Sequence, residues 1–137
     1  MATGVYNKGK YLLMTGGMNL ATGDIRCLLT TSAYTFDADH NFVSDITNEC
    51  SGTGYVRKAL AETVTEDDAS DYAWFDATDV VWTGADFGTP ARAIIYLHNA
   101  ADASAALLAC VDLTPAIPTN TGDYTVAWAA TGILRLT

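Results

Sequence analysis

The chain has 137 residues, half of them hydrophobic, and its 16 acidic and seven basic side chains give a formal net charge of −9. This length and apolar content predict a single domain over residues 1–137, with its own core, and exclude a disordered chain. The acidity would repel nucleic-acid phosphates and anionic lipids, so we expect neither nucleic acid nor a membrane as partner. No apolar run is long enough for a membrane span or a signal peptide, so we expect synthesis in a cytoplasm.

The first 20 residues predict a short helix or an extended arm. Tyr6, Leu12 and Leu13 do not make a long apolar stripe, and Gly9 weakens helix formation. The alternatives are a capping helix over residues 5–14, an arm laid across a neighbouring subunit, and a loose terminus.

A strand is expected to begin at Asp24. Both alternating sets of residues over Ile25–Leu29 are largely apolar, which predicts a strand with both faces covered. The segment Thr31–Phe36 is expected to continue it. A polar loop follows at residues 37–41, where Asn41 is expected to cap a single helical turn.

The segment Tyr55–Val64 alternates cleanly and predicts one longer strand after a glycine-containing turn at residues 48–54. The acidic segment Glu66–Asp71 follows it. Its four carboxylates lack the spacing of an EF-hand calcium loop, so they predict a solvated hairpin turn, with weak cation binding as the alternative.

The rest of the chain predicts short strands separated by turns. They are expected at Tyr72–Asp76, Val80–Trp82, Arg92–His98, Leu107–Leu113, Tyr124–Trp128 and Ile133–Leu136. The uncharged stretches around Ile94 and Val111 indicate central strands. About eight short strands with frequent turns predict an all-β fold, an antiparallel β-sandwich or a jelly-roll-like barrel. No long helix separates the strands, which argues against a parallel α/β sheet.

The three cysteines, Cys27, Cys50 and Cys110, show no CxxC spacing and are expected to be small buried residues, with a Cys27–Cys110 disulfide as the alternative. His40 is expected on an exposed loop, and His98 at the end of a strand. Neither histidine completes a zinc site or a catalytic triad by spacing.

The paired carboxylates and the tryptophans could in principle form functional sites, but we expect both groups to have structural roles. The pairs Asp37 with Asp39 and Asp76 with Asp79 would serve glycosidic chemistry only across a cleft. The three tryptophans, Trp74, Trp82 and Trp128, are expected in the core, a sugar-binding site being the alternative. We therefore predict no catalytic, cofactor-binding or metal-binding residue, no cofactor, and a protein that is not an enzyme.

Several stretches, taken in order, resemble a family of small virion proteins of tailed bacteriophages. The resemblance covers Ile25 to Leu136 and is carried by Phe42–Ile46, Asn48–Tyr55, Phe75–Trp82, Ala91–Tyr96, Leu107–Asp112, Tyr124–Trp128 and Gly132–Leu134. Cys50 departs from the pattern, in which valine is expected, and this argues against a disulfide shared by the family.

The resemblance implies a capsid decoration, or cement, protein that binds the major capsid protein shell. Its implied partners are the major capsid protein and copies of itself in a homo-oligomer, a trimer being one option. Its implied location is the capsid surface of the virion, after synthesis in the host cytoplasm. The alternative is another virion component, a neck, tail or fibre protein, with glycan binding as one option.

Overall fold

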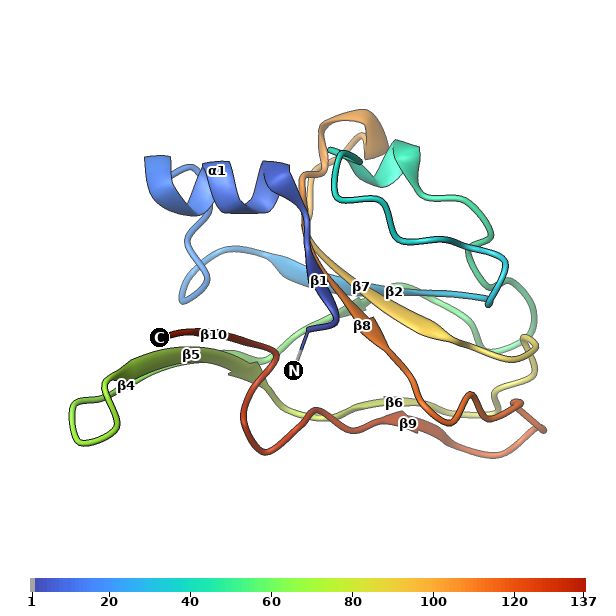
Figure 1. The fold of residues 1–137 in the computed structure, drawn as a ribbon. Coiled ribbons are helices and arrows are strands. Elements are labelled where there is room, and N and C mark those ends of the chain that lie inside the picture. The colour runs from blue at the N-terminus through green and yellow to red at the C-terminus, as the bar shows by residue number, and fades with distance from the viewer. Residues whose placement is uncertain (1) are drawn as a thin grey trace.

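The computed structural model describes residues 2–137 and confirms an all-β, sandwich-like fold with one short α-helix (Figure 1). Antiparallel strands make up three sheets. The elements are β1 (Gly4–Val5), α1 (Asn7–Thr15), β2 (Ile25–Thr30), a 3-10 turn (Val43–Asp45), β3 (Lys58–Ala59), β4 (Glu62–Asp67), β5 (Tyr72–Ala77), β6 (Val80–Trp82), β7 (Arg92–Leu97), a second 3-10 turn (Asp102–Ser104), β8 (Leu107–Asp112), β9 (Tyr124–Val126) and β10 (Leu134–Leu136).

The largest sheet has five strands in the order β1-β8-β7-β2-β3. Strands β7 and β8, which contain the uncharged stretches around Ile94 and Val111, lie inside it, as these stretches predict. Cys27 on β2 is level with Ile95 on β7, and the next row joins Leu28 to Ile94. Both rows are fully buried because both faces of this sheet are covered.

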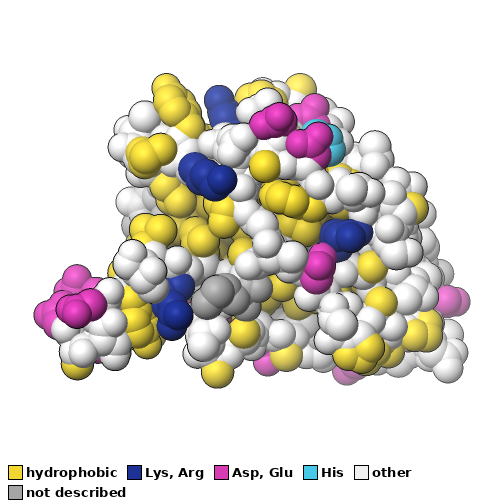
Figure 2. Space-filling model, viewed as in Figure 1, with side chains coloured by type: hydrophobic (Ala, Val, Ile, Leu, Met, Phe, Trp, Pro, Cys, Tyr) yellow, Lys and Arg dark blue, Asp and Glu magenta, His cyan; other side chains and the backbone are white. Residues whose placement is uncertain are grey.

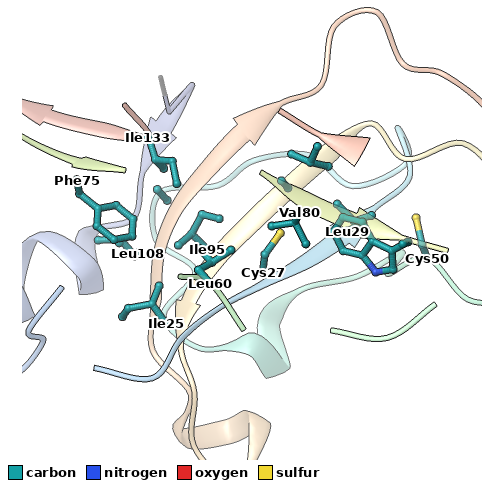
Figure 3. Close-up of a cluster of buried hydrophobic side chains, with 14 of the residues drawn as sticks. Ile25, Cys27, Leu29, Cys50, Leu60, Phe75, Val80, Ile95, Leu108 and Ile133 are labelled. Carbon is teal, nitrogen blue, oxygen red and sulfur yellow. The ribbon is translucent and has the colours of Figure 1, made fainter. Parts of the chain in front are cut away.

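The second layer consists of a three-stranded sheet, β10-β5-β4, and the two-stranded pair β6-β9. The larger of the two cores lies between this layer and the five-stranded sheet (Figure 3). Its labelled members include Ile25, Ile95 and Leu108 from the large sheet and Phe75 and Ile133 from the second layer. Burial of these side chains is the main term that stabilises the sandwich.

A second core lies on the other face of the five-stranded sheet. It joins Leu28, Ile94 and Leu107 to Tyr6 and Tyr34, which come from segments that cross this face. Cys110 belongs to this core, whereas Cys27 belongs to the first. The two thiols therefore lie on opposite faces of one sheet, and all three cysteines are buried and free. The disulfide alternative is wrong.

The described N-terminal residues form a short strand and the expected short helix, both of which lie on β8. Gly4 and Val5 pair with Cys110 and Ala109 of β8. Gly9 then brings α1 against the backbone of β8, so closely that an added Cβ would lie 2.8 Å from the Cα of Leu108. Glycine is required here by packing, which explains its place in a helix that it disfavours.

Two strand predictions are wrong. Thr31–Phe36 leaves the sheet after β2, because Tyr34 turns into the second core. Tyr55–Val64 is not one strand: only Lys58–Ala59 and the residues from Glu62 onward are extended in ladders. Leu60 turns into the first core between them. Alternation of residue types cannot reveal such a break, since each half alternates on its own.

The expected cap at Asn41 is also wrong. The Val43–Asp45 turn is capped by the carboxylate of Asp45, whose Oδ2 accepts hydrogen bonds from the backbone N–H groups of Asn41 (2.8 Å) and Phe42 (3.1 Å). These bonds lower the pKa of Asp45.

No helix among residues 2–137 combines the length and apolar character that a bilayer crossing requires.

Candidate contact surface

Helix α1 forms one wall of a groove on the surface. It begins directly after the buried Tyr6 in the chain, and Gly16 caps its C-terminal end. Gly16 has φ of +76°, a left-handed conformation typical of a glycine that ends a helix. The helix turns Leu12 and Leu13 partly inward but leaves Tyr11 57% and Met14 81% exposed. Tyr11 and Met14 therefore lie mostly outside the contact between the helix and its own sheet.

The opposite wall is the β10-β5-β4 sheet. Leu134, Phe75 and Val64 lie level across its three strands, and Leu136 lies level with Ala73 two rows further along. Phe75 is buried, but Val64 is 49% and Leu136 67% exposed. Strands β10 and β4 form the two edges of this sheet and have no further strand beside them among residues 2–137.

Between these walls runs an open groove of about 510 Å³, which we call the α1–β10 groove. It is lined by Val5, Lys10, Leu13, Met14, Leu134, Arg135 and Leu136. A smaller hollow of about 190 Å³ shares Leu13, Leu134 and Leu136 with it and extends toward Val64. Figure 2 shows apolar side chains in the hollow between α1 and the β4–β5 hairpin, with basic side chains at its borders.

Two basic side chains, Lys10 and Arg135, line this groove. Lys10 is exposed on α1, and Arg135 on β10 lies with its guanidinium 4.7 Å from the centre of the Tyr72 ring. Neither makes an ion pair among the described residues. The arginines of the main body differ, because Arg26, Arg57 and Arg92 each contact a carboxylate at 3.0 Å or less.

The β4–β5 hairpin projects from the same end of the molecule (Figure 1). Its turn carries Glu66, Asp67, Asp68 and Asp71, which we call the acidic tip. The hairpin-turn prediction for this segment is confirmed. The Asp67 carboxylate accepts a hydrogen bond from Ala69 N–H, and Asp71 has φ of +55°. None of the four carboxylates forms an ion pair in the part of the chain that is described.

His40 is not the free surface residue expected from its loop. It is half-buried, and its Nδ1 lies 3.0 Å from the hydroxyl of Tyr34, which in turn lies 2.9 Å from the hydroxyl of Tyr6. Burial raises the pKa of Tyr6 well above its usual value. This chain of hydrogen bonds satisfies the polar ends of two tyrosines buried in the second core, which is a structural role.

The thiols give no reactive nucleophile. Burial raises the pKa of Cys110 to about 12 and that of Cys50 to about 11, so neither is a thiolate near neutral pH. His98 follows the end of β7 as expected, and its backbone N–H donates to the carbonyl of Asp24.

A charged cluster that the sequence did not reveal joins three loops. The Arg57 guanidinium donates to Glu49 (2.8 Å) and to Asp102 (2.7 Å), and the Tyr55 hydroxyl donates to the same Glu49 (2.8 Å). Arg57 holds the pKa of the Asp102 carboxyl below its usual value. The one guanidinium is shared between two carboxylates, so the cluster ties these loops together and Arg57 is not free for a ligand.

Three other sequence candidates, Trp82, Asp76 and Asp79, are occupied by hydrogen bonds within the fold. Trp82 is completely buried and donates to Val56 O at 2.7 Å, so it cannot line a sugar site. Asp79 accepts from the backbone N–H of Trp128, and Asp76 from that of Ala77. Within residues 2–137, no cluster of three or more His, Cys, Asp or Glu side chains is placed to hold a metal ion.

Sequence reasoning missed the α1–β10 groove, although one signal for it was present. Tyr11, Leu12, Leu13 and Met14 are consecutive, so their side chains must point to nearly every side of a helix. A helix lying on a sheet can bury only part of such a set. The residues of β10 gave no comparable signal, because their exposure depends on which strands lie beside them.

Comparisons with models of known protein families, with curated proteins and with solved structures gave no match to this chain.

Proposed function

We propose that this protein is a structural component of a bacteriophage particle, a decoration protein that binds the major capsid protein shell without catalysing a reaction. The observation that carries the proposal is the α1–β10 groove with its exposed Met14 and Leu136. Exposed apolar grooves with polar borders are typical of surfaces that bind protein. The virion setting comes from the family resemblance of the sequence.

The shape of the molecule supports an assembly role. The groove and the projecting β4–β5 hairpin offer two different contact features at one end of a stable sandwich. A small protein that engages several neighbours through modest contacts gains a high total affinity, because each further contact is intramolecular. On a shell of many identical subunits such contacts are repeated, which is how a decoration protein stabilises a capsid.

Cosedimentation tests the proposal. The purified chain is mixed with empty expanded shells of the major capsid protein from the same phage, and in parallel with purified tails. We expect saturable binding to shells and none to tails. The variant Met14→Asp/Leu136→Asp should bind shells more weakly, whereas Ile117→Asp, at an apolar residue 57% exposed outside the α1–β10 groove, should bind as the unaltered chain does. Binding to tails alone would replace the decoration role with a tail role.

A further inference from the structure

Unmatched charges of opposite sign are placed at one end of the molecule. Among residues 2–137, four basic side chains make no ion pair, namely Lys8, Lys10, Lys58 and Arg135. Lys10 and Arg135 line the α1–β10 groove, whereas Lys8 lies over the rings of Tyr11 and Phe42. In a chain of net charge −9, this concentration of free cations beside an apolar surface favours an acidic occupant.

The acidic tip has the complementary chemistry. Residues 67–72 extend past the last paired residues of β10, since Leu136 pairs with Ala73. Among residues 2–137, their carboxylates form no ion pair with the cations of their own groove. Just behind the tip, β4 presents the exposed Val64 and a free strand edge. A segment with acidic ends and an apolar stem matches a groove with basic borders and an apolar floor.

We propose that the occupant of the α1–β10 groove is the acidic tip of a second copy of this chain, in a reciprocal dimer. The hairpin and the groove lie at the same end of the molecule (Figure 1). One two-fold axis at this end would place each tip at the other copy's groove, so that one self-complementary interface contains the tip–groove contact twice. This inference rests on the proposed function only in taking the groove as a protein contact. A dimer would present two copies of the chain to the shell at once, so variants that break the dimer would also weaken shell binding.

The first experiment measures self-association by sedimentation velocity, at chain concentrations up to about 100 μM. We expect a monomer–dimer equilibrium that weakens as salt is raised, because salt screens exposed charge pairs. Lys10→Glu and the double variant Glu66→Lys/Asp68→Lys should each raise the dissociation constant by about tenfold or more. Circular dichroism and thermal unfolding check that each variant is folded.

Matched controls separate this contact from a general effect of charge. Lys58→Glu changes the net charge as Lys10→Glu does, but on β3 at the far edge of the large sheet. Asp123→Lys repeats one of the two acid-to-lysine changes of the tip variant at an exposed position outside both the groove and the tip. Both controls should dimerise as the unaltered chain does.

A mixture of the two charge-reversed proteins provides the decisive test. In a mixed dimer the acidic tip of the Lys10→Glu chain meets an unaltered groove, and the basic tip of the other chain meets Glu at position 10. Mixing should therefore restore the dimer that each protein alone has lost. Failure of the mixture to associate would overturn the proposal, as would a monomeric or trimeric unaltered chain at about 100 μM.

Shell binding is measured on the same proteins, so the two proposals fail separately. A dimer that behaves as expected but ignores capsid shells supports the tip-in-groove contact and refutes the decoration role. A monomer that binds shells, and loses that binding on Lys10→Glu, makes the capsid protein the occupant of the groove and overturns the dimer.

Discussion

The five-stranded sheet and the β10-β5-β4 sheet are built from similar strands but differ in what surrounds them. Both faces of the first are covered, and its central strands β7 and β8 are almost wholly buried. The second is covered on part of one face, ends in two free edges, and carries an exposed strand in β4. The comparison indicates that the large sheet supplies most of the stability, while the smaller one is available for contacts.

The largest effect should come from a cavity in the five-stranded sheet. Ile95→Ala removes a fully buried side chain from the first core and should lower the free energy of unfolding by about 3 to 4 kcal/mol. Val64→Ala removes an aliphatic side chain from β4, where Val64 is half exposed, and should cost less than about 1 kcal/mol. Urea unfolding followed by tryptophan fluorescence measures both. Equal losses would contradict the division between the two sheets.

The next effect tests how α1 is attached to the large sheet. Alanine normally stabilises a helix relative to glycine by about 1 kcal/mol. Gly9→Ala should instead destabilise the protein by about 2 kcal/mol, because the added methyl meets the backbone of Leu107 and Leu108 at 2.8–3.0 Å. Gly122→Ala, where nothing lies within 4 Å of the added atom, should change little. Thermal unfolding of the two variants compares them; a more stable Gly9→Ala protein would mean that the helix is not in close contact.

A smaller effect is expected from the charged cluster. Arg57→Met leaves Glu49 and Asp102 without their partner and should cost about 1 to 2 kcal/mol, since the cluster is partly exposed to solvent. The folded-state pKa of Asp102 lies below its ordinary value of 3.8. Its contribution is therefore present above that value and is lost as pH falls through the lower, folded-state pKa.

Measuring the same loss of unfolding free energy at several pH values is the control for this prediction. The difference in unfolding free energy between the unaltered chain and Arg57→Met should shrink as pH falls below about 4, where Asp102 of the variant takes up a proton first. Urea titrations at several pH values measure it. A difference that stays constant down to the lowest pH would show that Arg57 acts through packing, for example against Tyr96, and not through Asp102.

The smallest effect on stability should come from the acidic tip. Asp68→Asn changes an exposed carboxylate that makes no ion pair in the described part of the chain, and should alter the unfolding free energy by less than about 0.5 kcal/mol. Thermal unfolding at low protein concentration measures this without a contribution from association. A clear gain in stability would indicate that repulsion within the tip strains the hairpin.

The sequence by itself determined the fold class and most of the strands. The runs Val80–Trp82, Arg92–Leu97 and Leu107–Asp112 are short, apolar and bounded by turn residues, so their extended state follows from local composition. The acidic turn after β4 was equally clear, since adjacent carboxylates favour solvent. These features depend on neighbours in the chain, which the sequence contains.

Only the tertiary structure decided what each apolar residue contacts. Tyr34 ends a predicted strand because a second core exists on the far face of the large sheet, and Gly9 enters a helix because β8 passes beneath it. Leu134 and Leu136 differ little from other strand residues in sequence. They border the α1–β10 groove because β10 is an edge strand facing α1, and strand order is set by packing between segments far apart in the chain.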